Sequence, residues 1–165
     1  MFRIGSGFDV HPLVTERNLI LGGVRIPFEK GLLGHSDADV LAHAIMDGLL
    51  GALALGDIGI HFPDTDSRYK NADSMEMLKR VYQKIVQQQY TLVNLDCTIM
   101  AQRPRIMPYM TAIQNNIASV LNAEVSQISI KATTTEKLGF VGREEGIAAQ
   151  AVVLLQKINF TLNGG

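Results

Sequence analysis

The sequence has a single cysteine and no excess of charge of either sign, and each shortage excludes a class of protein. Cys97 alone cannot form an intrachain disulfide, and its place in a strand-like segment favours buried packing over catalysis. The 15 Lys plus Arg residues nearly balance the 16 Asp plus Glu residues. The chain therefore has no general attraction for DNA or RNA, and we expect no nucleic-acid partner. A ligand that carries phosphate must be bound by groups close to it.

Long apolar runs and low-complexity tracts are also missing. No apolar run approaches the roughly 18 residues of a membrane span, and the N-terminus lacks the basic-then-apolar pattern of a signal peptide. We therefore predict a soluble protein, cytoplasmic in a bacterium, with no membrane partner. The 165 residues, 47% of them hydrophobic, fit one compact domain with one core. We expect this domain to cover residues 1–160 and residues 161–165 to form a flexible tail.

Short apolar segments rich in β-forming residues lie between segments with helical periodicity. The expected strands are 2–10, 19–27, 93–99, 128–132 and 146–158, and the expected helices are 39–55, 73–89 and 107–121. The alanines and glutamine of 146–158 also permit a helix. We expect the first two strands to pair, with Gly22 and Gly23 as a break or bulge. Ser36 and Asp39 resemble a capping box before the first helix. The order of elements predicts an α+β fold, a single mixed sheet with helices on one face.

Asp9 and His11 are the first candidates for chemistry. Alternate side chains of a strand share a face, so these two point one way while Phe8 and Val10 point the other. His43 offers a third ligand, and three such ligands leave a fourth position of a zinc ion open to water or substrate. Two plainer interpretations stay open at this stage: a hydrogen-bonded turn around Asp9 and His11, and a surface His43 paired with Asp39 or Asp47.

Two loops are further candidates for a binding site. Residues 56–66 belong to a loop of nearly twenty residues, which is long for a compact domain and is either functional or a solvated turn. Residues Thr133 to Glu136 offer hydroxyls, turn amides and one carboxylate, with Lys131, Lys137 and Arg143 nearby. This set suits a phosphate group whose charge is shared with a hard cation, although Thr-rich strand ends are also ordinary.

Five segments together closely resemble the 2-C-methyl-D-erythritol 2,4-cyclodiphosphate synthase family. They are GFDVH at 7–11, HSD at 35–37, ALGDIG at 54–59, FPDTD at 62–66 and KATTTEKLGF at 131–140. The likeness extends in order over nearly the whole chain. Three residues depart from it: Ser6 and Ala38 stand where His and Gly are expected, and His61 replaces an apolar residue. None of the three is an expected ligand.

The resemblance implies a lyase of the non-mevalonate isoprenoid pathway. Such an enzyme converts 4-diphosphocytidyl-2-C-methyl-D-erythritol 2-phosphate to the 2,4-cyclic diphosphate and CMP, through attack of the 2-phosphate of the substrate on its own β-phosphorus. It implies Zn²⁺ held by Asp9, His11 and His43, and Mg²⁺ or Mn²⁺ held by Glu136 with the substrate phosphates. It also implies a homotrimer with sites between neighbouring subunits.

Roles for further residues follow from the same resemblance. His35 and Thr134 would align and stabilise the reacting phosphates, and 101–107 would line a cytidine pocket. The full implied substrate-binding set is Asp9, His11, His35, Ser36, Asp57, Ile58, Gly59, Phe62, Pro63, Asp64, Thr65, Asp66, Ala101, Gln102, Arg103, Pro104, Arg105, Ile106, Met107, Thr133, Thr134, Thr135, Glu136, Phe140 and Arg143. Two other interpretations compete: a metal-dependent phosphohydrolase, and a non-catalytic trimer that binds a nucleotide or an isoprenoid diphosphate.

Overall fold

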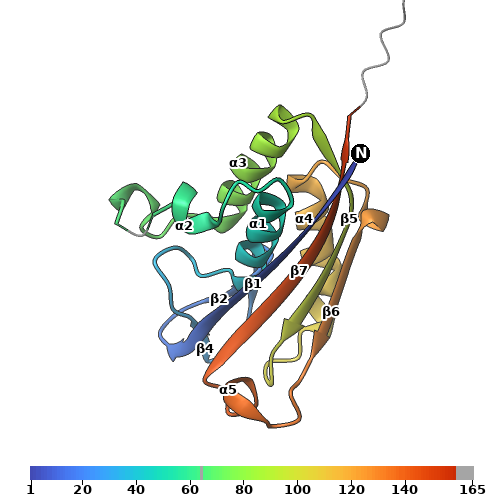
Figure 1. The fold of residues 1–165 in the computed structure, drawn as a ribbon. Helices are drawn as coiled ribbons and strands as arrows, with labels where there is room; N and C mark the ends of the chain where they lie inside the picture. The colour runs from blue at the N-terminus through green and yellow to red at the C-terminus, as the bar shows by residue number, and fades with distance from the viewer. Residues whose placement is uncertain (64, 159–165) are drawn as a thin grey trace, which may run out of the picture.

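A five-stranded mixed sheet forms the centre of the computed structural model, which describes residues 1–63 and 65–158 (Figure 1). Its order is β4-β1-β7-β5-β6. The strands are β1 (Phe2–Thr15), β4 (Lys30–Leu32), β5 (Tyr90–Met100), β6 (Ile128–Thr133) and β7 (Gly146–Lys157). Only β5 and β6 pair in parallel within this sheet, and the other neighbours are antiparallel. The expected mixed sheet is confirmed, and 146–158 contains a strand. The expected tail at 161–165 lies outside the described residues.

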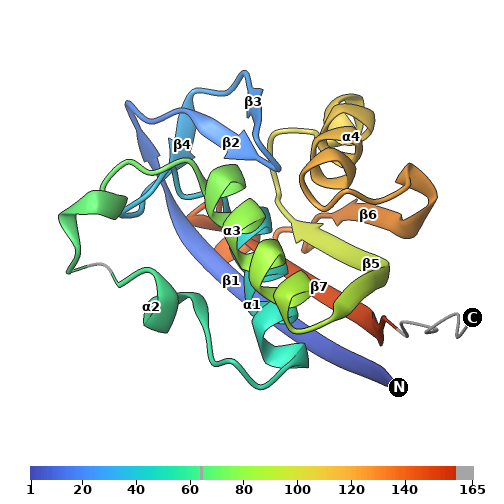
Figure 2. The same ribbon diagram turned by 90° about the horizontal axis from the view of Figure 1, so that it is seen from above.

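Three longer helices cover one face of the sheet (Figure 2). They are α1 (Val40–Ala52), α3 (Ser74–Gln87) and α4 (Met110–Val120), with short turns α2 (Ile58–His61), α5 (Gly139–Gly142), η1 (Ser67–Tyr69), η2 (Met107–Tyr109) and η3 (Val125–Gln127). Their apolar faces bury a core that includes Leu49, Leu78 and Ile113. Within the described part of the chain, no helix combines the length and apolar character needed to cross a membrane.

Two glycines of β1 allow α1 to lie directly on the strand. A Cβ atom at Gly7 would lie 1.9 Å from the carbonyl oxygen of Ala44, and one at Gly5 would lie 2.0 Å from that of Gly48. Such distances are far below van der Waals contact, so only glycine permits this approach. The glycines therefore bring the first turns of α1 over the part of β1 that carries Asp9 and His11.

The expected pairing of the first two strands is wrong. Residues 19–27 form their own hairpin, β2 (Leu19–Leu21) with β3 (Val24–Ile26), while β1 pairs with β4 and β7. Gly22 and Gly23 are the turn of this hairpin and not a bulge, because their φ angles of 55° and 73° fit the two-residue turns that join antiparallel strands. The hairpin buries Leu19, Leu21 and Ile26 against the core.

The expected capping box before α1 is also wrong. Asp39 is the N-cap, and its carboxylate accepts a hydrogen bond from the backbone N–H of Ala42 at 3.1 Å. The Ser36 hydroxyl instead accepts from the N–H of Ala38 at 3.2 Å. Ala38 has φ of 58°, a left-handed conformation that separates Ser36 from the helix and explains why the family resemblance suggests glycine there.

Candidate metal and substrate site

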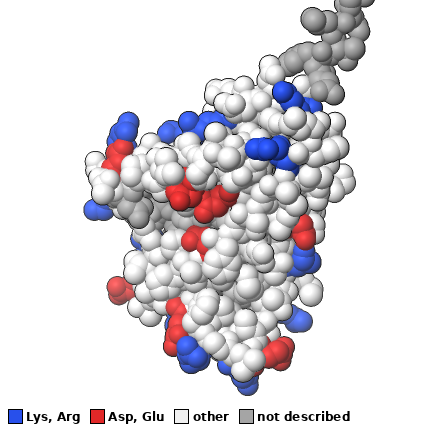
Figure 3. Space-filling view, in the orientation of Figure 1, with Lys and Arg blue, Asp and Glu red and all other residues white. Residues whose placement is uncertain are grey.

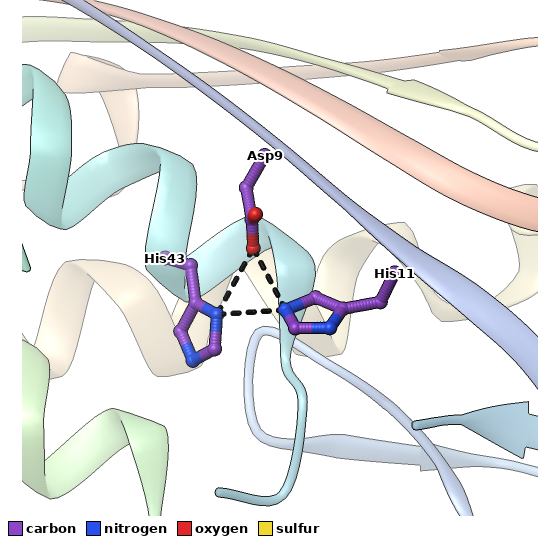
Figure 4. Close-up of side chains that lie close together, drawn as sticks. All are labelled: Asp9, His11 and His43. Atoms are coloured by element: carbon purple, nitrogen blue, oxygen red, sulfur yellow. Dashed lines mark hydrogen bonds and ion pairs between the residues drawn. The ribbon is translucent and has the colours of Figure 1, made fainter. Parts of the chain in front are cut away.

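Asp9, His11 and His43 meet at the junction of β1 and α1 (Figure 4). Oδ2 of Asp9 lies 2.9 Å from Nε2 of His11 and 3.0 Å from Nδ1 of His43, and the two nitrogens are 3.1 Å apart. A tetrahedral zinc ion with bonds of about 2.0–2.1 Å needs ligand atoms about 3.3 Å apart. One oxygen and two imidazole nitrogens in this triangle are a donor set that suits zinc, so these residues could hold a metal ion.

The alternative partners considered for His43 are engaged elsewhere. Asp39 accepts hydrogen bonds from the backbone N–H groups of Gly22, Gly23 and Ala42. Asp47 accepts from the N–H of Ile58 at 2.8 Å. His43 is buried and faces Asp9. The interpretation of His43 as a surface histidine is therefore wrong.

Asp9 and His11 shift each other's pKa values. Burial disfavours the charged form of either group, but the ring nitrogens of His11 and His43 beside its carboxylate hold the pKa of Asp9 well below its usual range. The bond to Asp9 and the Leu33 carbonyl likewise raise the pKa of His11. Nδ1 of His11 lies 2.9 Å from that carbonyl oxygen and must donate to it, so Nε2 faces the triad.

A cavity of about 270 Å³ opens beside the triad. Its lining includes the expected residues His35, Ser36, Ile58, Gly59 and Phe62, together with Gly34, Tyr69 and Met77. Sequence reasoning missed Tyr69 and Met77. The Tyr69 ring packs edge-on against Phe62 at 5.2 Å between centroids, and its only sequence signal is its place soon after the FPDTD segment. Met77 shows only the helical spacing of a core residue.

Of the acidic residues expected in the same loop, Asp57 and Asp66 do not line this cavity. Asp57 caps α2 through Ile60, and Asp66 caps η1 and forms an ion pair with Arg68. The Asp66 carbonyl oxygen lies 3.4 Å from Nε2 of His35, which ties the loop to the cavity wall. Pro63 and Thr65 belong to the same connection, and Asp64 lies outside the described residues.

The surroundings of the triad are acidic. Burial and the neighbouring carboxylates of Asp57 and Asp9 raise the pKa of Asp47. Figure 3 shows acidic side chains close together in the middle of one face, with basic side chains toward its margins. An anionic ligand would be repelled here unless a cation were bound as well.

A larger cavity of about 620 Å³ lies at the ends of β5 and β6. All seven residues expected to line a cytidine pocket border it: Ala101, Gln102, Arg103, Pro104, Arg105, Ile106 and Met107. Thr133 and Thr134 also contribute. Phe28 and Glu29, which sequence reasoning missed, complete the wall, and Glu29 and Glu144 both form ion pairs with Arg103. This arrangement joins three distant segments around one hollow large enough for a nucleoside.

The Thr133 to Glu136 segment is mostly exposed and makes mainly local contacts. The Thr134 hydroxyl donates to Glu136 Oε1 at 3.2 Å, and the Thr135 hydroxyl donates to the Leu138 carbonyl at 2.7 Å. Phe140 and Arg143 follow on the connection to β7, where Arg143 forms an ion pair with Glu145. The segment thus presents its hydroxyls and one carboxylate to solvent.

The two candidate half-sites are separated within the chain. Strand register places Asp9 beside Ala149, Ala149 beside Ile99, and Ile99 beside Ala132. Three strand spacings amount to about 14 Å. Glu136 is also not part of any cluster of metal-binding groups found in the described residues. The structure therefore brings Asp9, His11 and His43 together but does not join them to the Thr133 to Glu136 segment.

Comparison with known proteins gives one consistent result. Residues 2–156 match the model of the YgbB family. The chain is 67% identical to the 2-C-methyl-D-erythritol 2,4-cyclodiphosphate synthase of Geobacillus sp. (strain WCH70) and 61% identical to that of Bacillus subtilis (strain 168), in each case over 95% of this chain and 99% of the relative.

Solved structures agree with this result. The bifunctional IspDF from Campylobacter jejuni superposes with a TM-score of 0.94 at 48% identity, covering 98% of this chain and 44% of that protein. A CDP complex of IspF from Plasmodium falciparum gives a TM-score of 0.85 at 38% identity, covering 96% of this chain and 97% of that one. With the triad, both cavities and these matches in agreement, the chain belongs to the YgbB family, that of the 2-C-methyl-D-erythritol 2,4-cyclodiphosphate synthases.

Proposed function

We propose that this chain converts 4-diphosphocytidyl-2-C-methyl-D-erythritol 2-phosphate to 2-C-methyl-D-erythritol 2,4-cyclodiphosphate and CMP, as a cytoplasmic enzyme formed by residues 1–160. The observation that carries the proposal is the Asp9, His11 and His43 triad on the wall of a cavity that also contains His35 and Ser36. The identities of 60–67% to synthases over nearly the full chain support it.

The reaction needs no nucleophile from the protein. The 2-phosphate of the substrate forms a bond to the β-phosphorus while the bond from that phosphorus to the CMP oxygen breaks. The task of the chain is to hold the attacking and leaving oxygens in line and to offset repulsion between the phosphates. Zinc held by Asp9, His11 and His43, and magnesium or manganese held by Glu136, would supply the positive charge for this.

We assign the remaining roles to residues of the two cavities. His35, on the wall of the triad cavity, would hold one phosphate, and the Thr134 hydroxyl would donate to another. Ser36, Ile58 and Gly59 would surround the methylerythritol phosphate, with Asp57 and 62–66 shaping the loop over it. Residues 101–107 would hold the cytidine, since they border the 620 Å³ cavity. The CDP complex of the P. falciparum relative supports a cytidine nucleotide as the ligand of this region.

We further propose that the enzyme is a homotrimer whose sites form between subunits. The sheet face opposite the helices exposes Phe2, Ile4, Phe8, Val10 and Val152, and 57% of Phe8 is exposed. Exposed apolar side chains gathered on one face of a sheet often mark an interface. The distance of about 14 Å between the half-sites within one chain is a second support, because a site completed by a neighbouring subunit would bring them together.

Product analysis tests the proposed activity. Purified chain is incubated with the cytidylyl substrate, zinc and magnesium, and the products are separated by chromatography and identified by ³¹P NMR. The proposal predicts equal amounts of the cyclic diphosphate and CMP. Inorganic phosphate as the product would instead identify a phosphohydrolase. Tight binding of the substrate without turnover would identify a binding protein.

A further inference from the structure

Ser74, the first residue of α3, contacts His43 on the side of the ring that faces away from Asp9. Its side chain is fully buried, and its Oγ lies 3.0 Å from Nε2 of His43, the ring nitrogen that faces away from Asp9. Ser74 also donates its hydroxyl hydrogen to Oδ1 of Asp37, and its backbone N–H donates to Oδ2 of the same carboxylate at 3.1 Å. Neither residue belongs to the substrate-binding or metal set argued above.

Counting protons fixes the direction of these bonds. A serine hydroxyl has one hydrogen, and that of Ser74 points to Asp37, a carboxylate that only accepts. The contact between Ser74 Oγ and His43 Nε2 is therefore a hydrogen bond only if Nε2 carries the proton. With the proton on Nε2, the Nδ1 lone pair of the neutral ring points toward Asp9 and His11, where a metal ion would bind.

The Ser36 hydroxyl offers the opposite arrangement. Its Oγ lies 3.1 Å from the same Nε2 and is free to donate to it. In that case the neutral His43 ring would carry its proton on Nδ1 and donate it to Asp9 at 3.0 Å. A ring in this form has no lone pair left for a metal ion at Nδ1. Ser36 therefore permits either tautomer, because its hydroxyl can also donate to Ser74 Oγ at 3.4 Å, whereas Ser74, oriented by the Asp37 carboxylate, permits only the proton on Nε2.

We infer that Ser74, held by Asp37, is a positioning residue that keeps His43 in the tautomer able to bind a metal ion through Nδ1. This inference rests on the proposed metal site. Groups behind a metal-binding histidine commonly fix its tautomer and ring orientation, and losing them lowers metal affinity by about 10- to 100-fold. The beginning of α3 then contributes to the metal site without touching metal or substrate.

Zinc affinity and the His43 tautomer test the inference in the full-length chain. Ser74→Ala removes the acceptor with little change in volume, and we expect its zinc affinity to fall by about tenfold or more in competition with a chelating dye. In the metal-free chain, ¹⁵N NMR of the imidazoles should show the His43 proton moving from Nε2 toward Nδ1. Ser74→Thr, which keeps the hydroxyl, should restore both properties.

Asp73→Ala is the matched control. Asp73 precedes Ser74 and caps α3 by accepting from the N–H of Met75 at 2.8 Å, so its loss weakens the same helix start but leaves the Ser74 hydroxyl in place. We expect lower thermal stability with unchanged zinc affinity. An equal loss of affinity in Asp73→Ala would show that helix stability, and not the hydroxyl, is responsible, and would overturn the inference.

The other outcomes are equally decisive. Wild-type zinc affinity and an unchanged tautomer in Ser74→Ala would overturn the role of Ser74 and leave the metal site intact. A wild-type chain that binds no zinc would overturn the metal site itself. If Ser74→Ala does not fold, Asp37→Asn decides by the same two measurements, because an amide at this position no longer fixes the direction of the Ser74 hydroxyl and should also weaken zinc binding.

Discussion

The two halves of the proposed site are built in opposite ways. Around Asp9, His11 and His43 each ring is oriented by a group behind it, the Leu33 carbonyl for His11 and Ser74 for His43, and α1 lies close against β1. The Thr133 to Glu136 segment is mostly exposed and bonds mainly to its own neighbours in sequence. The first half is preorganised within one chain. The second half has groups suited to phosphate, and its hydroxyls bond within the segment or to the nearby Leu138.

This difference separates two physical requirements. A metal ion needs ligand atoms that stay within a few tenths of an ångström of their ideal coordination positions. Only side chains fixed by a packed interior keep their atoms at such positions. Phosphate groups and a cation that retains waters tolerate more freedom, and an exposed loop can close on them when a partner subunit and substrate arrive. Changes in the first half should therefore affect the metal directly, and changes in the second half should affect turnover alone.

The largest effect should come from breaking the preorganised half. His43→Ala leaves two ligands, too few to hold zinc tightly, so bound zinc should fall from about one ion per chain to near none. Turnover should fall by roughly a thousandfold or more, because the loss of a bound cation removes several kcal/mol of charge stabilisation. Metal analysis after dialysis and steady-state assays measure both, and His61→Ala is the control. Full zinc content in His43→Ala would remove this residue from the site.

A smaller effect is expected in the exposed half. Glu136→Gln keeps the shape of the side chain but loses the charge that a hard cation prefers, so turnover should drop roughly 10- to 100-fold with zinc content and stability unchanged. Excess magnesium should restore part of the activity. Glu76→Gln, an exposed carboxylate on α3, controls for loss of charge alone. Full activity of Glu136→Gln at limiting magnesium would show that Glu136 is not a ligand.

The preorganised half was also the more predictable one. Strand alternation was enough to place Asp9 and His11 on one face, and the structure confirms that Phe8 and Val10 point away from them. For Gly22 and Gly23 the sequence left a break or a bulge open, because a glycine pair serves equally well as a bulge or as the turn of a hairpin, and only the packing of Leu21 and Ile26 decides. The family resemblance supplied the assignment of 101–107 and of Thr134.

Contacts between distant segments could not be predicted from local pattern. Ser74 and His43 are 31 residues apart, and nothing in a helix start beginning with Asp73 and Ser74 indicates that a metal-binding histidine lies behind it. Phe28 and Glu29 of the larger cavity were missed for the same reason, because they follow a hairpin whose position the sequence did not reveal. These features depend on which elements pack together, and therefore on the whole fold.

The smallest predicted effect tests whether the two halves meet across a subunit boundary. His43→Ala and Glu136→Gln chains should each be weakly active alone, because every site then contains one defective half. When the two are unfolded and refolded together in equal amounts, a site between neighbours has about a one-in-four chance of joining an intact triad to an intact Glu136. Activity should recover to about a quarter of wild type if sites act independently.

A site contained within one chain predicts a different number from the same mixture. Every chain then keeps its own lesion, and the activity is only the average of the two variants, whatever the composition of the trimers. Native mass spectrometry must first confirm that mixed trimers have formed, because separate homotrimers would give the same average. With mixing confirmed, a recovery to about one quarter of wild-type activity requires the exposed Thr133 to Glu136 segment to act on the triad of a neighbouring subunit. An activity equal to the average of the two variants would mean that this segment crosses the gap of about 14 Å within its own chain.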